Sequence, residues 1–223
     1  MRSAFTKIPT QLFVLLAVAA CASGSRAQQA AAPTTAPATT QSTNNSVDAQ
    51  HAYTAPDIRF MDGMISHHAQ ALVMAGWASS HGASASVQTL ASRIINAQQD
   101  EIAGMQKWLR DRHQPVPDAN PHGMTMNMNG MTHEMLMPGM LTESQLKQLD
   151  NSRGNEFDRL FLTFMIQHHT GAVTMVKELF DTPGAAQDIT VFKMASDVSA
   201  DQTTEIERMQ KMLASVIFGP DTP

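Results

Sequence analysis

The sequence predicts an all-α protein: a four-helix bundle built from two repeated helical hairpins, with a methionine-rich loop that connects them. Two observations carry this prediction. Residues 54–218 contain an internal repeat, and apolar residues recur every three or four positions within the repeated segments. A single helical hairpin cannot cover its own apolar face, so the two hairpins are expected to pack together.

Each half of the repeat begins with a helix that carries a Met-Ile-x-His-His motif, at 64–68 and again at 165–169. A second helix follows in each half and carries Gln-x-x-Glu-Ile-x-x-Met-Gln-Lys, at 98–107 and at 202–211. The same pair of helices is therefore expected twice along the chain.

Local sequence signals mark where these helices begin and end. Thr54 and Asp57 form a capping box with proline in the first turn, which predicts the start of the first helix. Asp158 stands opposite Asp57 in the repeat, and both aspartates are interpreted as helix-start residues. Ser-His-Gly at 80–82 and Thr-Pro-Gly at 182–184 predict a break after the first helix of each half.

The N-terminus has the layout of an export signal over residues 1–20, with a positively charged start and a short apolar run at 12–20. Val-Ala-Ala-Cys at 18–21 resembles a bacterial lipobox, which would lipidate Cys21, the sole cysteine. Ser-Arg-Ala at 25–27 offers an ordinary cleavage site instead. That alternative predicts a soluble periplasmic or secreted protein without an anchor.

Residues 21–53 are mostly Ala, Thr, Gln, Ser, Pro and Asn without apolar periodicity, which predicts a disordered, low-complexity tether. Such a tether would hold an anchored domain away from a membrane surface. The protein is therefore expected to be exported to the periplasm and attached to a membrane only through lipid. In a Gram-negative cell this would be the outer membrane.

The amino-acid composition limits the partners and the metal ligands that this chain can have. Fifteen Lys and Arg stand against 20 Asp and Glu, without a basic run, so nucleic acid is not an expected partner. One cysteine excludes both an internal disulfide and a cysteine zinc site. The 17 methionines outnumber the aromatic residues, of which there are 12 (Phe 9, Trp 2, Tyr 1). Metal chemistry in this chain must use histidine, methionine or carboxylates.

The duplicated Met-x-x-His-His motif is the first candidate metal site. On a helix, side chains three and four positions apart meet, so the methionine reaches both histidines that follow it. Glu101 and Glu205 are interpreted as acceptors that orient the imidazole N–H groups, although metal ligands or surface carboxylates are alternatives. Buried histidines that bond only to carbonyl groups are the alternative for the imidazoles. The predicted ligands in the bundle are Met64, His67, His68, Met165, His168 and His169.

The connecting loop, at 113–141, is the second candidate. Seven methionines fall between 124 and 140, and Leu136 is the only aliphatic residue among them. An apolar core would mix in Leu, Ile and Val, and a solvated linker would avoid so much apolar sulfur. Thioether sulfur is a soft, neutral ligand that suits Cu(I) or Ag(I). The predicted ligands in the loop are His122, Met124, Met126, Met128, Met131, His133, Met135, Met137 and Met140.

The segment FDRLFLTFMIQHHTGAVTMV, at 157–176, followed by Gln-x-x-Glu-Ile, resembles the Domain of Unknown Function 305 (DUF305) family of bacterial proteins. The resemblance covers about residues 55–215. It implies a ferritin-like helical bundle, and because some members are periplasmic copper-binding proteins implicated in copper tolerance, it also implies copper as the metal. By this resemblance, the methionine and histidine positions become candidate copper ligands.

The leading hypothesis is an exported copper-binding protein that sequesters copper or hands it on, and so contributes to copper tolerance without enzymatic chemistry. Cu(I) is expected in the loop, and Cu(II) is the candidate for the histidines of the bundle. Metal ions, and copper-transport or copper-chaperone proteins, would be the partners. The sequence does not predict an oligomeric state.

Two alternatives come from other functional classes. A ferritin-like di-metal oxidase would use histidine and glutamate in the bundle core, but such sites usually carry Glu-x-x-His, which this chain lacks. A surface-tethered structural bundle could instead absorb oxidants through reversible formation of methionine sulfoxide. A measurement of copper affinity would distinguish a copper-binding protein from such a structural bundle.

Overall fold

The computed structural model describes residues 52–128 and 131–219, and these ranges contain five helices and two strands. No helix there is long and apolar enough to cross a membrane. The signal segment, Cys21 and nearly all of the predicted tether lie outside the described residues. The elements are α1 (Ala55–Gly76), α2 (Ala85–Asp111), β1 (Met124–Met128), β2 (Met131–Met135), α3 (Glu143–Asp150), α4 (Gly154–Asp181) and α5 (Ile189–Phe218).

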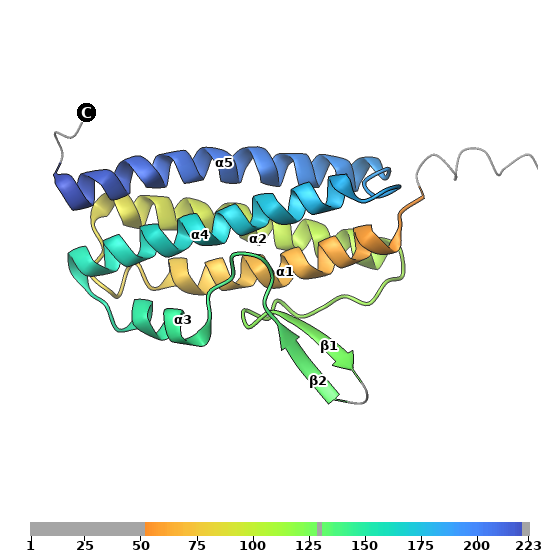
Figure 1. The fold of residues 1–223 in the computed structure, drawn as a ribbon, viewed down its shortest axis with the longest axis horizontal. Coiled ribbons are helices and arrows are strands. Elements are labelled where there is room, and N and C mark those ends of the chain that lie inside the picture. Colours follow the sequence, from red (N-terminus) through yellow and green to blue (C-terminus); the bar gives the residue numbers. More distant parts are fainter. Residues whose placement is uncertain (1–51, 129–130, 220–223) are drawn as a thin grey trace, which may run out of the picture. The chain divides into compact units, whose positions relative to one another are not determined.

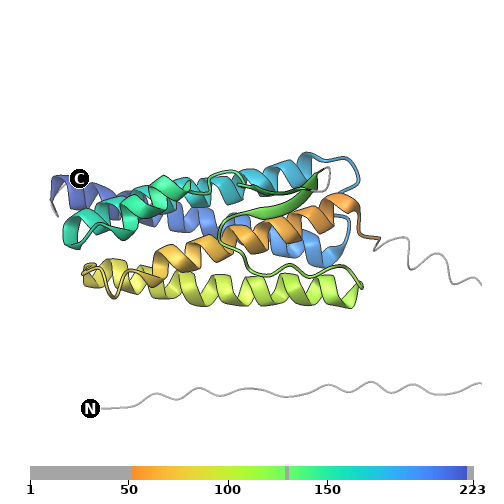
Figure 2. The ribbon, with the colours of Figure 1, turned by 90° about the horizontal axis from the view of Figure 1, so that it is seen from below.

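The four long helices form two helical hairpins, α1 with α2 and α4 with α5 (Figure 1). Helices α1 and α4 also pack on each other, so they form the seam between the two halves of the repeat (Figure 2). This arrangement agrees with the predicted all-α class and with the predicted pair of helical hairpins. Its relationship to ferritin-like bundles stays a prediction.

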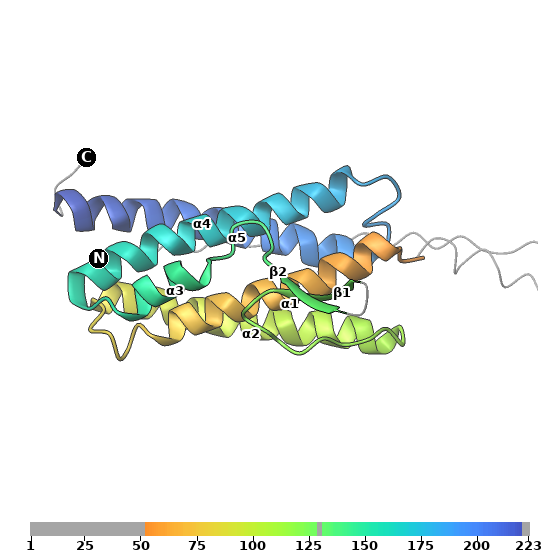
Figure 3. The same ribbon diagram turned by 60° about the horizontal axis from the view of Figure 1, so that its bottom comes forward.

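The connecting segment was expected to be a loop, and this expectation was wrong. Strands β1 and β2 pair antiparallel in register, with Met124 opposite Met135, and the pair lies beside α1 (Figure 3). Methionine at every second position over 124–128 matches the two-residue period of a strand, which explains the difference. Helix α3, which the sequence reading also missed, begins at a capping box between Thr142 and Gln145.

The two aspartates predicted as helix starts have a further role, because each binds the turn of the opposite hairpin. Asp57 accepts hydrogen bonds from the backbone N–H and hydroxyl of Thr54, at 2.7 and 2.8 Å, which confirms the capping box. Its other oxygen accepts from the backbone N–H of Ala186 at 2.7 Å. Asp158 accepts from the N–H of Ser84 at 3.1 Å. The buried carboxylates therefore join the two halves reciprocally.

The apolar core consists of two clusters at successive positions along the helices. One includes Phe60, Met105 and Val198, and the other includes Met74, Ile94 and Phe161. Between the two clusters, each long helix contributes polar residues instead of apolar ones. This set, called the polar layer below, consists of His67, His68, Gln98, Glu101, His168, His169, Gln202 and Glu205.

The segment after β2 crosses the seam between α1 and α4 at very close range. A side chain at Gly171 would place its Cβ 1.9 Å from the carbonyl oxygen of Pro138, so only glycine fits there. Gly139 follows with a φ of +77°, a backbone conformation that favours glycine. The buried amide of Gln70 bonds the N–H and carbonyl of Leu141, at 2.6 and 3.1 Å. The segment is thereby fixed to both helices.

We predict that Gly171→Ala lowers the free energy of unfolding by about 1–3 kcal/mol, because the new Cβ forces the segment away from α4. Gly76→Ala is the matched control, since a Cβ at this helix end meets nothing within 4 Å. The control should be as stable as the wild type or slightly more stable. Chemical denaturation measures both changes. Equal stability of the two variants would contradict the close contact.

Candidate metal centre

The polar layer repeats one arrangement in each half of the molecule. All four of its imidazoles are fully buried. His68 Nε2 donates to a carboxylate oxygen of Glu101 at 2.7 Å, and His169 Nε2 donates to Glu205 at 2.7 Å. A carboxylate that accepts a hydrogen bond from Nε2 fixes the orientation of the imidazole. The other ring nitrogen, Nδ1, is then the one left to bind a metal. The glutamates thus take the positions expected of orienting acceptors.

The remaining two histidines lie against each other across the seam. The ring centroids of His67 on α1 and His168 on α4 are 3.8 Å apart. His67 Nε2 donates to the carbonyl of Pro138 at 3.0 Å, which places this ring directly under the connecting segment. Neither ring nitrogen of His168 forms a well-aligned hydrogen bond within the described ranges, and the backbone of His67 interacts with it only weakly, which raises the pKa of His168 against the larger effect of burial. Such a buried imidazole, without a well-aligned hydrogen bond, is unusual in a structural core and is typical of a functional site.

Burial keeps these two rings neutral. Burial, together with the neighbouring charge of His68, lowers the pKa of His67 to about 3. Burial likewise holds the pKa of His168 well below its usual value, with further contributions from His67 and His169. Only unprotonated imidazole binds a metal, so both rings are in the competent form at neutral pH.

The histidines do not by themselves form a complete metal site. Across residues 52–128 and 131–219, no group of three or more His, Cys, Asp or Glu side chains is arranged to hold a metal ion. The predicted partners Met64 and Met165 are both fully buried, but they belong to different apolar clusters. The two Met-x-x-His-His motifs are therefore not equivalent in their surroundings. Only Met64 shares a cluster with methionines of the connecting segment.

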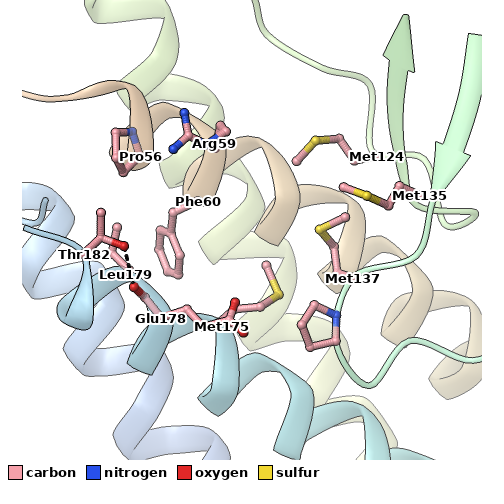
Figure 4. A pocket seen from close by; sticks show the side chains of 11 residues that line it. Pro56, Arg59, Phe60, Met124, Met135, Met137, Met175, Glu178, Leu179 and Thr182 are labelled. Atoms are coloured by element: carbon pink, nitrogen blue, oxygen red, sulfur yellow. Dashed lines mark hydrogen bonds between the residues drawn. The ribbon is translucent and has the colours of Figure 1, made fainter. Parts of the chain in front are cut away.

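A separate group of thioethers surrounds a cavity of about 260 Å³ between α1, α4 and the connecting segment (Figure 4). A Cβ added to Gly63 would lie 3.1 Å from Met137 Sδ, 3.2 Å from Met124 Cε and 3.4 Å from Met175 Cε, so these side chains converge at one point on α1. Glycine at this position leaves the room that they occupy. The set, called the thioether pocket below, consists of Met124, Met135, Met137 and Met175.

Met175 is the member of the thioether pocket that sequence reasoning missed. It stands opposite Met74 in the repeat, and neither methionine is among the ligands that the sequence predicts. Met74 is indeed fully buried in an apolar cluster. Met175 is also buried in an apolar cluster, and in addition it lines the cavity, opposite the methionines of the connecting segment (Figure 4). No local pattern distinguishes the two methionines, because the difference arises from the segment that crosses only one of them.

The other predicted ligands in the connecting segment have different surroundings. His122 is exposed in a turn and lines a different, smaller cavity. Met140 is buried, and its sulfur accepts a hydrogen bond from the N–H of Met137 at 3.3 Å. Met135 is 46% exposed at the edge of the thioether pocket. For the remaining four, the backbone lies in β1 or β2 while the side chains are outside the described part: Met126, Met128, Met131 and His133.

Comparison with known proteins identifies the class of this chain. The family model described as "Domain of unknown function (DUF305)" matches residues 57–213, and the protein belongs to this family. No protein with curated annotation matches it. A DUF305 fragment from Deinococcus radiodurans is 26% identical in sequence, with a TM-score of 0.59 over 73% of this chain and 97% of that one.

Two further solved structures are similar. A DUF305 protein of Streptomyces coelicolor, described as secreted, is 27% identical with a TM-score of 0.59, over 75% of this chain and 95% of that one. CopM in a Cu(II)-bound form is 27% identical with a TM-score of 0.55, over 71% and 96% of the two chains. CopM has also been solved with Cu(I) and with silver.

We predict that the metal-free protein loses stability as the pH falls below about 6.5. A histidine whose folded-state pKa lies below its unfolded value binds fewer protons when folded. Stability is therefore complete above the unfolded pKa and declines toward about pH 3 for His67, by up to about 1.4 kcal/mol per pH unit per histidine.

The measurement is chemical denaturation of two variants between about pH 7 and about pH 5. His168→Leu should flatten the pH dependence of the unfolding free energy, whereas His122→Leu, at an exposed position, should leave it as in the wild type. Both variants contain the same carboxylates, so carboxylate titration does not contribute to the difference between their slopes of unfolding free energy against pH. Parallel curves for the two variants would show that His168 is not held neutral by burial.

Proposed function

We propose that this protein binds copper as cargo, without catalysing a reaction, and that it sequesters the metal or passes it on in support of copper tolerance. The single observation that carries the proposal is the thioether pocket, in which methionines from α4, β1, β2 and the connecting segment line one cavity. Similarity to CopM, a protein solved with Cu(I), Cu(II) and silver, supports it.

Cu(I) is the ion that the thioether pocket suits. Neutral sulfur ligands stabilise a soft monovalent ion through polarizability, and they offer little to a hard, strongly hydrated dication. Met137 and Met175 are 8% and 7% exposed, so an ion held between them would be largely shielded from water. Met135, more exposed at the edge, is positioned to meet an ion that enters or leaves.

We further propose that the histidines of the polar layer serve Cu(II) or a mixed oxidation state. Imidazole accepts Cu(II) where thioethers do not. Glu101 and Glu205 would hold His68 and His169 in a fixed orientation, as carboxylates do for metal-binding imidazoles. Because the described residues contain no preformed group of three His, Cys, Asp or Glu ligands, binding there requires a local shift of side chains or a ligand from Met64.

Export and anchoring belong to the same proposal. The export signal, the lipobox around Cys21 and the tether support a periplasmic protein that lipid attaches to a membrane. Methionine keeps its affinity for Cu(I) in such an oxidising compartment, where free cysteine would be oxidised. Copper-transport or copper-chaperone proteins would be the partners. Mass spectrometry of the mature N-terminus decides the anchor, because a start at Gln28 would exclude lipidation of Cys21.

The test of the copper proposal is a triple variant, Met124→Leu/Met137→Leu/Met175→Leu. Leucine conserves volume and apolarity, so the fold should persist while the sulfur ligands are lost. We expect affinity for Cu(I) to fall at least about tenfold, which corresponds to about 1.4 kcal/mol. Anaerobic competition with a chromophoric Cu(I) chelator measures the change.

The matched control for this variant is Met74→Leu/Met209→Leu, which changes two fully buried methionines of the other apolar cluster. It should bind Cu(I) as the wild type does. Zn(II) is the reference ion, because thioethers are poor ligands for it in both the control and the triple variant. The proposal fails if the triple variant retains the Cu(I) affinity and stoichiometry of this control.

A further inference from the structure

A second cavity lies in the polar layer between α2 and α5, away from the thioether pocket. Its volume is about 170 Å³, and equivalent residues of the two halves line it: Gln98 and Glu101 from α2, and Gln202 and Glu205 from α5. These are the glutamine and glutamate of the duplicated Gln-x-x-Glu motif. The copper proposal uses the glutamates only as partners of histidine, and it leaves the glutamines without a role.

The two glutamines are the unusual feature of this cavity. Gln98 is 2% exposed and Gln202 is 3% exposed, yet neither the amide oxygen nor the amide nitrogen of either has a partner in the described part of the chain. A buried amide that forms no hydrogen bond is destabilising, and native proteins contain few of them. Two such amides at equivalent positions facing one cavity indicate that something polar completes them there.

The glutamates supply charge to the same cavity. Each uses one carboxylate oxygen for its histidine, and within the described residues the other oxygen accepts no hydrogen bond. The carboxylates are 24% and 23% exposed, so a ligand can reach them from the solvent side. Two negative charges at this place match one divalent cation.

The surroundings on the solvent side are acidic on balance. Asp201 lines the cavity, and burial raises its pKa, with the charges of Glu101, Asp197 and Glu205 adding to the shift. An adjoining hollow of about 370 Å³ adds Asp100 and Asp197. Two exposed arginines also line the cavity, Arg93 and Arg208, and neither forms an ion pair with a described residue.

We propose that Gln98, Glu101, Gln202 and Glu205 bind one hard divalent cation, such as Mn²⁺, Ca²⁺ or Mg²⁺, between α2 and α5. Carboxylate and amide carbonyl oxygens are the ligands that these ions prefer, with water completing the coordination. Because two carboxylates alone are too few, the amides are needed to make four oxygen ligands. The cation would cross-link the two hairpins, and it is distinct from copper held by thioethers.

Mn²⁺ is the probe for the test. It is added to the full-length protein without copper, and free Mn²⁺ is quantified by its electron paramagnetic resonance signal, with Ca²⁺ and Mg²⁺ as competitors. We expect one Mn²⁺ per chain and a rise in Tm on binding. Gln98→Leu/Gln202→Leu should weaken Mn²⁺ binding at least about tenfold and abolish the rise in Tm.

Two controls keep the outcome clear. Gln99→Leu/Gln210→Leu changes exposed neighbours on the same helices and should bind Mn²⁺ as the wild type does. If circular dichroism shows that the buried leucine variant does not fold, Glu101→Gln/Glu205→Gln replaces it, because it removes the charge and keeps the shape. The cation site is wrong if the wild type binds no Mn²⁺, or if these variants bind it unchanged.

This outcome is separable from that of the copper proposal. The leucine variant at the two glutamines leaves Met124, Met137 and Met175 intact, so its Cu(I) affinity should equal that of the wild type. Loss of Mn²⁺ binding with retained Cu(I) binding supports two independent sites. Loss of both ions together in a folded variant would contradict the separation of the cavity from the thioether pocket.

Discussion

The contact between Pro138 and Gly171 is the constraint on which both candidate copper sites depend. Because α4 has no side chain at this position, the connecting segment lies directly on the seam between α1 and α4. The same contact brings the carbonyl of Pro138 to His67 and places Met137 above Met175. A wider separation would open the thioether pocket and leave the buried imidazole of His67 without its acceptor.

The polar layer shows how one fold can separate soft and hard chemistry. Thioethers gather at the end of α1 and α4 that the connecting segment covers, whereas carboxylates and amides face the groove between α2 and α5. The imidazoles lie between them, with His68 and His169 bonded toward the carboxylates. Such buried polar groups reduce stability unless ligands satisfy them, so we expect the protein to be more stable with metal than without.

The internal repeat was sufficient to predict the four long helices and their breaks, and it favoured Glu101 and Glu205 as acceptors for imidazole N–H groups, because those features depend on local periodicity and on symmetry. It could not predict what breaks the symmetry. Met175 and Met74 are equivalent in sequence, yet only Met175 lies under the connecting segment. The contact of Asp57 with the far turn likewise arises from tertiary placement, which a helical pattern does not encode. The hairpin β1–β2 is different, because the alternating methionines of β1 have the period of a strand and the loop prediction did not use that signal.

The most direct test of the account is the position of a soft metal in crystals of the protein. Ag(I) mimics Cu(I), resists oxidation and scatters anomalously, so its sites can be mapped without assuming a ligand. The account predicts a silver peak within bonding distance of the sulfur atoms of Met137 and Met175, beside Gly63. Silver bound only elsewhere in the chain, with the thioether pocket empty at full loading, would contradict it.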